Sequence, residues 1–282
     1  STPWAGRLIE DFYKKISDPA YLKPLEEIWS NMTIQQLDTF RRIFPLLHPH
    51  AAETLAHLLL MQQPAESEKL VTDILIHYVN KDASCLDSLI HNSSEGIATK
   101  ILSVLLGLEA NTSLKYLLQL ARHSSIPVRR MAIRAIAGNH GSQISAIFNF
   151  MDDPDASVRN MILKYMGQSR NETAEDLLLQ YLQKINFNDA ESEQIINGFR
   201  TLGKCGSSKS VPLLRKILLQ RQWIAGLSKS ADREGAALAL IALNIPEAQK
   251  VIEEASRSLN PGLRKIVRDA QQEFIQKKGG GR

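Results

Sequence analysis

Apolar residues recur at spacings of three and four along nearly the whole chain, and no segment sustains the alternation of a β-strand. This spacing places apolar side chains on one face of an α-helix. Breaks rich in Pro, Asn, Ser and Asp recur about every 12 to 18 residues, which predicts roughly sixteen or seventeen short helices. At one break, Thr33 and Gln36 have the spacing of a capping box. The pattern predicts an all-α protein.

The second half of the chain repeats itself. Residues 125–138 and 155–167 both contain Val-Arg-x-Met and both end in glycine. Weaker copies occupy residues 193–203, 232–240 and 260–268, and a leucine-rich helix precedes each copy. Because a single hairpin of helices cannot bury its own apolar face, such repetition indicates hairpins stacked side by side.

One copy carries a recognisable turn. The segment Asp153-Pro154-Asp155-Ala156-Ser157-Val158-Arg159 resembles the Asp-Pro-x-x-x-Val-Arg turn of HEAT repeats, particularly the short PBS-lyase HEAT-like type. The resemblance covers about residues 111–277. It implies a right-handed α-solenoid of stacked antiparallel helix pairs, a HEAT-like or ARM-like superhelix, whose second (B) helices line a concave face.

The same resemblance divides the chain into three regions. Residues 1–110 form an N-terminal helical region, which consists of diverged repeats or of a separate cap. Residues 111–277 form the HEAT-like repeat array. Residues 278–282 are expected to be a flexible tail.

Charge is distributed unevenly behind a formal net charge of +4. Residues 110–282 hold 25 Lys and Arg against 16 Asp and Glu, whereas residues 1–109 hold 9 against 14. A positive surface field attracts acidic proteins and polyanions. The alternative is that the helix faces simply carry scattered, solvated lysines and arginines.

Two groups of basic residues stand out. The first group has no obvious acidic neighbour in the sequence and is predicted to form a partner-binding basic face: Arg130, Arg134, Lys164, Arg200, Lys204, Lys209, Arg215 and Lys216. The second recurs at the start of the B helices: Arg129, Arg159, Arg233 and Arg264. The HEAT resemblance implies that these four form a structural ladder by pairing with an Asp of an adjacent turn, as Asp155 would with Arg159.

Patterns typical of catalysis are weak. Residues 198–205 match the Gly-x4-Gly-Lys spacing of a phosphate loop, but Cys205 replaces the Mg²⁺-binding Ser or Thr, and Gly203 is better interpreted as a helix C-cap. His50, Glu53 and His57 can share a helix face without a supporting cysteine, which favours a surface role over a zinc site. The sequence therefore predicts no enzyme, no cofactor and no metal.

Two functions remain in competition. The preferred hypothesis is a non-catalytic interaction or scaffold module, part of a larger bacterial regulatory or signalling protein, that binds an acidic protein segment or a neighbouring domain through the basic concave face. The alternative is a nucleic-acid-binding, DNA-glycosylase-like protein, although the B helices and their connections offer only Tyr165, Phe199 and Trp223 for stacking on bases. No apolar run is long enough for a membrane span, and two cysteines without a framework favour a cytoplasmic location.

Overall fold

The computed structural model describes residues 3–91, 93–139, 144–184, 192–219 and 228–279. Every regular element in these ranges is a helix. The chain divides into two compact units, residues Ser1–Gly141 and Ser142–Arg282, which are described separately. The expected boundary at residue 110, between the N-terminal helical region and the repeat array, stays a prediction. The expected tail, 278–282, overlaps the end of the last helix, and its residues 280–282 lie outside the described ranges.

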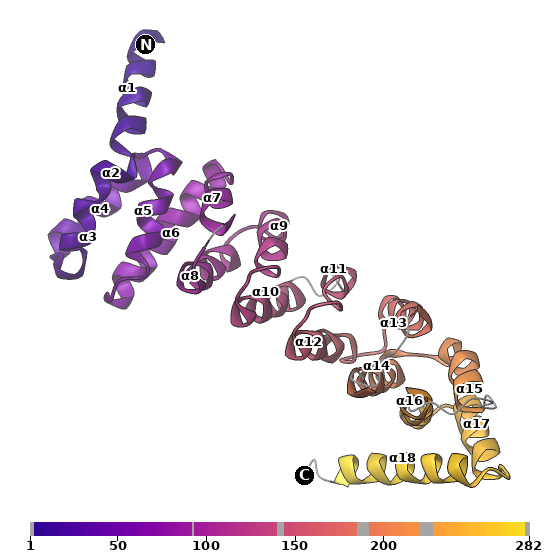
Figure 1. Ribbon diagram of the computed structural model, residues 1–282. Helices are drawn as coiled ribbons and strands as arrows, with labels where there is room; N and C mark the ends of the chain where they lie inside the picture. Colours follow the sequence, from indigo (N-terminus) through magenta and orange to yellow (C-terminus); the bar gives the residue numbers. More distant parts are fainter. Residues whose placement is uncertain (1–2, 92, 140–143, 185–191, 220–227, 280–282) are drawn as a thin grey trace. The chain divides into compact units, whose positions relative to one another are not determined.

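The first unit stacks its helices in two layers (Figure 1). Its helices are α1 (Pro3–Ile16), α2 (Pro19–Leu22), α3 (Pro24–Ile28), α4 (Ile34–Ile43), α5 (Ala52–Leu58), α6 (Ala65–Lys81), α7 (Cys85–His91), α8 (Glu95–Leu106), α9 (Ala110–Leu120) and α10 (Ile126–Asn139), with short 3₁₀ turns at Trp29–Asn31, Phe44–Leu46 and Pro49–Ala51. One layer contains α2, α5, α7 and α9, and the other contains α4, α6, α8 and α10. The predicted capping box is confirmed, since the Thr33 side chain accepts from Gln36 N and the Gln36 side chain accepts from Thr33 N.

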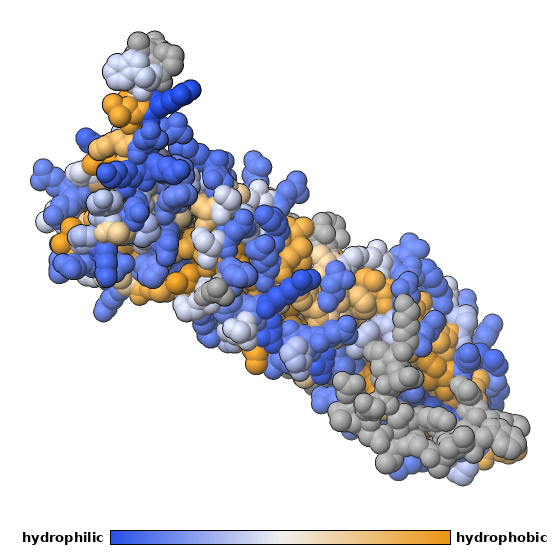
Figure 2. Space-filling model, turned by 45° about the horizontal axis from the view of Figure 1, so that its top comes forward, coloured by the Kyte–Doolittle hydropathy of each residue, from blue (hydrophilic) through white to orange (hydrophobic). Residues whose placement is uncertain are grey.

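Aromatic side chains fill the beginning of this unit. The Trp29 and Phe40 rings lie 4.9 Å apart between centroids, and Phe40 stacks on Phe44 at 3.7 Å. The buried Tyr78 hydroxyl donates to the Phe44 carbonyl at 2.5 Å, so its polar end is satisfied inside the core. In contrast, α1 exposes one apolar face with Trp4, Leu8 and Phe12. Hydrophobic (orange) atoms are visible on this helix near the top of Figure 2.

The second unit also has two layers (Figure 1). Its helices are α11 (Ile144–Phe148), α12 (Ala156–Met166), α13 (Glu172–Lys184), α14 (Ser192–Cys205), α15 (Val211–Leu219), α16 (Ser228–Leu243), α17 (Pro246–Ser256) and α18 (Pro261–Gly279), with a 3₁₀ turn at Ser208–Ser210. The first (A) helices, α11, α13, α15 and α17, form one layer, and the B helices, α12, α14, α16 and α18, form the other. The predicted all-α fold of stacked antiparallel helix pairs is confirmed.

Glycines set the spacing between α14 and α16. A Cβ added at Gly203 would lie 2.8 Å from the Cα and the carbonyl oxygen of Ala239, and one at Gly235 would lie 2.4 Å from a ring atom of Phe199. The two backbones can approach closely only because these positions lack a side chain. The interpretation of Gly203 as a C-cap is therefore wrong: α14 continues to Cys205, and Gly203 is a buried packing residue inside it.

Candidate functional site

A cavity of about 330 Å³ lies in the second unit between the B helices α12 and α14. It is lined by Asn160, Leu163, Lys164, Gly167, Asn197, Arg200, Thr201 and Lys204. Three of these residues, Lys164, Arg200 and Lys204, belong to the predicted basic face. None of the eight lining residues is acidic. We refer to this cavity as the α12–α14 groove.

Helix geometry brings the basic side chains to the groove. Asn160 and Lys164 are four residues apart on α12, as are Arg200 and Lys204 on α14, so each pair shares one helix face. Lys164 and Lys204 both lie in the last turn of their helices, where a cation interacts favourably with the helix dipole. Each amine therefore lies near the C-terminal end of its helix.

Gly167, at the end of α12, lies against side chains of α14 beside the groove. A Cβ at this position would meet the Lys204 Cδ atom and the Thr201 Cγ2 atom, each at 3.4 Å. The apolar stem of Lys204 therefore lies against the backbone at the end of α12. This contact holds the stem while the amine remains exposed.

Hydrogen bonds order the floor of the groove. Asn197 Nδ2 donates to Asn160 Oδ1 at 3.2 Å, which joins the two helices. Arg200 Nη1 donates to Asn197 Oδ1 at 3.1 Å, and Arg200 Nη2 donates to Glu273 Oε1 of α18 at 2.7 Å. The third guanidinium donor, Arg200 Nε, is buried without a hydrogen-bond partner.

The groove carries an excess of positive charge. Lys164 and Lys204 are exposed, and neither has an acidic partner within ion-pair distance among the residues that the structure describes. Arg200 is balanced by Glu273, whose side chain is 28% exposed against 30% for Arg200. Two lysine charges therefore remain available to an anion.

The other predicted binding residues lie elsewhere, and several are paired. Lys209 Nζ contacts Asp176 at 2.5 Å and Glu172 at 3.9 Å, and Arg215 Nη2 contacts Glu254 at 2.9 Å. The premise that Arg200, Lys209 and Arg215 lack acidic neighbours is therefore wrong. Lys216 is exposed on α15 outside the groove. Arg130 and Arg134 are exposed on α10 of the first unit.

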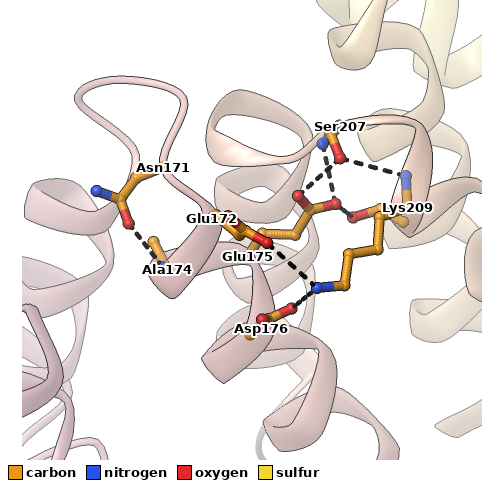
Figure 3. Close-up of polar contacts among 8 residues, drawn as sticks. Asn171, Glu172, Ala174, Glu175, Asp176, Ser207 and Lys209 are labelled. Atoms are coloured by element: carbon orange, nitrogen blue, oxygen red, sulfur yellow. Dashed lines mark hydrogen bonds and ion pairs between the residues drawn. The ribbon is translucent and has the colours of Figure 1, made fainter.

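A buried carboxylate next to Lys209 was missed by the sequence interpretation (Figure 3). Glu175, on α13, is only 2% exposed. It accepts hydrogen bonds from Ser207 N at 2.9 Å, from Ser207 Oγ at 2.8 Å and from Ser210 Oγ at 2.5 Å. Glu175 therefore fastens α13 to the segment that leads into α15. Nothing in the local sequence distinguishes it from the exposed acids of the same helix.

The arginines at the start of the B helices bind backbone carbonyls. Arg159 Nη1 donates to the carbonyls of Asp153 (2.6 Å) and Pro154 (3.1 Å), six and five residues earlier. Arg129 Nη1 reaches the carbonyls of His123 and Ser124, also six and five residues earlier, and Arg264 Nη1 reaches that of Ser258, six residues earlier.

This arrangement differs from the pairing expected between Arg159 and Asp155. In the described residues the guanidinium of Arg159 contacts two carbonyls and no carboxylate. Asp155 caps α12 by accepting from Ser157 N at 2.8 Å and from Val158 N at 3.3 Å. Arg233 of α16 is half-buried. Arg159 therefore secures the turn of its own hairpin, and pairing across repeats by the other three arginines stays a prediction.

Thiol chemistry and metal binding find little support in the described ranges. Burial, with a further contribution from the Glu175 charge, raises the pKa of Cys205 to about 12, and burial raises that of Cys85 to about 12 as well. Neither thiol is therefore an activated nucleophile. The described residues contain no group of three or more His, Cys, Asp or Glu that could hold a metal ion.

Part of the chain matches a known class of helical repeat. Residues 114–196, which include α12 and the beginning of α14, match the family model of HEAT repeats. The chain thus contains HEAT repeats, as the turn at residues 153–159 predicted.

Comparison with curated proteins found no match. Among solved structures, the chain is similar to human deoxyhypusine hydroxylase in complex with glycerol, at 13% sequence identity and a TM-score of 0.36. The similarity covers 97% of this chain and 99% of that chain.

This comparison corrects two predictions. The chain was predicted not to be an enzyme and to act as a non-catalytic scaffold, but a protein to which it is similar along 97% of its length is an enzyme by its name. Both predictions are therefore wrong as they stood. With a TM-score of 0.36, the similarity carries no argument about a reaction or a substrate.

Proposed function

We propose that the second unit binds an acidic polypeptide segment, of another protein or of a neighbouring domain of the same chain, through the α12–α14 groove. The observation that carries the proposal is the convergence of Lys164, Arg200 and Lys204 on one cavity with no acidic lining residue. A concave, positively charged surface concentrates negatively charged ligands. Stacked helical repeats typically use such extended surfaces for binding.

The polar floor of the groove supports a polypeptide ligand. Asn160 and Asn197 line the cavity, and the amide of an asparagine side chain can both donate to and accept from a peptide group. The hydrogen bond between these two side chains holds them in place before a ligand arrives. Orientation in advance lowers the entropic cost of binding.

A nucleic acid is less well matched. Single-stranded nucleic acids are typically held by aromatic side chains that stack on bases, together with basic residues that track the phosphates. Phe199 is 0% exposed and so cannot stack on a base, and Trp223 lies outside the described residues. Tyr165 is half-buried. Support for nucleic-acid binding therefore reduces to charge alone.

Fluorescence anisotropy of a short, fluorescein-labelled peptide of alternating glutamate and glycine tests the proposal. At low salt we expect the full chain to bind this probe, and we expect Lys164→Glu with Lys204→Glu to weaken binding by about tenfold or more, or roughly 1.4 kcal/mol. The matched control is Lys216→Glu with Lys250→Glu, which makes the same charge change in the same unit outside the groove. The control should retain binding within about twofold.

Two outcomes would contradict the proposal. One is equal weakening by the groove pair and the control pair, which would show a general charge effect. The other is tighter binding of a random DNA duplex than of the peptide, with a steep salt dependence that the groove pair reduces.

We also propose a cytoplasmic location. The proposal is supported by the two cysteines, Cys85 and Cys205, which are free thiols in the structure. Among the described residues, no helix has the length and apolarity needed to cross a bilayer.

A further inference from the structure

We propose that the group held in the α12–α14 groove is a phosphorylated serine or threonine side chain of the bound polypeptide. This inference rests on the proposed function and specifies the chemistry of its ligand. It follows from which donors in the groove are free and which are already occupied.

The guanidinium of Arg200 is largely committed to the protein. Its two terminal nitrogens donate to Asn197 and to Glu273, at 3.1 and 2.7 Å. A carboxylate is recognised best by two parallel hydrogen bonds from an arginine fork. Each terminal nitrogen keeps a second N–H, but the Glu273 carboxylate already balances the charge of the guanidinium, so a glutamate or aspartate side chain would gain little from pairing with it.

The donors that remain are single and separate. They include the amines of Lys164 and Lys204 and the Nδ2 group of Asn160, whose oxygen already accepts from Asn197. Lysine amines act as point charges that suit a phosphate group. A phosphate presents three acceptor oxygens in a tetrahedral arrangement, which separate donors can satisfy from several directions.

Charge points to the same ligand. The two unpaired lysines provide two positive charges, and Arg200 is balanced by Glu273. A phosphorylated side chain carries a charge of about −1.5 to −2 near neutral pH, whereas a carboxylate carries −1. The dianion therefore neutralises the groove more completely.

The size of the cavity is compatible with a phosphate group. Its volume of about 330 Å³ is many times the roughly 10 to 15 Å³ that one enclosed water molecule requires. A tetrahedral phosphate ester fits within this space together with bridging waters.

The test compares three versions of one labelled peptide of glycine, alanine and serine that differ only at the central residue: phosphoserine, glutamate or serine. We expect the phosphoserine peptide to bind the full chain about tenfold more tightly than the glutamate peptide. The second ionisation of phosphate has a pKa of about 6, so affinity for the phosphopeptide should rise between about pH 5 and pH 7.5, while affinity for the glutamate peptide stays nearly constant.

Variants assign the preference to the groove. Lys164→Gln with Lys204→Gln should abolish the advantage of phosphoserine over glutamate, and Asn160→Ala should reduce it. Lys216→Gln with Lys250→Gln should leave it unchanged. Circular dichroism of each variant checks that the helices are intact.

The outcomes separate this inference from the proposed function. Groove-dependent binding of the glutamate-rich peptide, with no advantage for phosphoserine, overturns the inference and leaves the proposed function standing. Binding of neither probe overturns both. If inorganic phosphate competes at the same concentration as the phosphopeptide, the groove is a site for the free ion and the inference is also overturned.

Discussion

Adjacent arginines in α10 have different structural roles. Arg129 is 8% exposed and donates to the carbonyls of His123 and Ser124 at 3.0 and 2.9 Å. Arg130, the next residue, is exposed. Arg129 is thus a buried arginine that satisfies carbonyls between the two helices of its hairpin, and the half-buried Arg159 makes the same contacts in the next hairpin. Carbonyls at a helix end that lack such a donor are costly when they are buried.

We therefore expect Arg129→Met to lower the free energy of unfolding by about 2 to 3 kcal/mol, since two carbonyls lose a charged donor. Arg130→Met should change it by less than about 0.5 kcal/mol, because its side chain is exposed. Urea unfolding followed by circular dichroism measures both. Equal effects of the two substitutions would show that Arg129 contributes no more than an exposed arginine does.

Some residue roles can be predicted from the sequence, whereas roles that depend on contacts between distant residues cannot. Sequence reasoning placed Arg129 and Arg159 in a structural class because their repeat position is visible in the sequence. The acidic partners of Arg200 and Arg215 are not visible in this way, because they lie 73 and 39 residues away along the chain. Contacts between repeats depend on how neighbouring hairpins are aligned, and a local window of sequence does not contain that alignment.

At the scale of elements, glycine decides how closely α14 and α16 pack. A Cβ at Gly203 would lie 2.8 Å from two backbone atoms of Ala239 and 2.8 Å from the Cβ of Ala242. Backbone atoms cannot rotate away, so relief requires the helices to move apart. In contrast, a Cβ added at Gly138 of α10 would have no atom within 4 Å.

This contrast predicts opposite effects of one substitution. Gly203→Ala should destabilise the protein by about 3 kcal/mol through overpacking. Gly138→Ala should stabilise it by about 0.4 to 1 kcal/mol, because alanine restricts the unfolded chain and favours the helix. Thermal and urea unfolding of the two variants provide the measurement. A neutral Gly203→Ala would mean that α14 and α16 tolerate a wider separation.

The link between α13 and the next hairpin depends on the charge of Glu175. Its carboxylate accepts from one backbone amide and two hydroxyls. Glu175→Gln replaces an acceptor with an NH₂ group that faces donors, and we expect a loss of about 2 to 3 kcal/mol in the free energy of unfolding.

Glu172→Gln is the matched control for this substitution. Glu172 lies on the same helix with a side chain that is 85% exposed, and its ion pair with Lys209 spans 3.9 Å. An exposed pair of this kind contributes little, so the control should change stability by less than about 0.5 kcal/mol. A loss of similar size in both variants would show that the three hydrogen bonds of Glu175 add nothing beyond its charge.

At the scale of the whole molecule, the sequence predicted the fold much better than the groove. The three-and-four spacing of apolar residues and the repeated turn determine the class of fold, because each hairpin must bury one face against its neighbours. Lys164 and Lys204 were within the predicted set, but their meeting at one cavity depends on how α12 and α14 are aligned, to which the Asn160–Asn197 bond between the helices contributes. One signal in the sequence could have located the groove, namely polar residues that lie four apart on successive B helices. Examples are Asn160 with Lys164 and Asn197 with Thr201.

Glu273 connects the stability of the second unit with the proposed binding at the groove. This residue of α18 pairs with Arg200 across α16, so it ties the last B helix to α14 and also places a negative charge beside the groove. Glu273→Gln removes that charge. We expect stability to fall by about 1 kcal/mol, because the pair is only partly buried, and affinity for the glutamate–glycine peptide to rise about threefold, because one repulsive charge is lost.

Glu254→Gln provides the comparison for this last prediction. Glu254 also pairs with an arginine, Arg215, at 2.9 Å, but neither residue lines the groove and both side chains are about half exposed. This variant should change the stability by less than about 0.5 kcal/mol. It should leave the affinity for the glutamate–glycine peptide unchanged. Opposite shifts of stability and affinity in Glu273→Gln alone would place the ligand next to Arg200. If Glu273→Gln weakens binding together with stability, Glu273 serves to position Arg200 for the ligand, and the groove needs the ion pair intact.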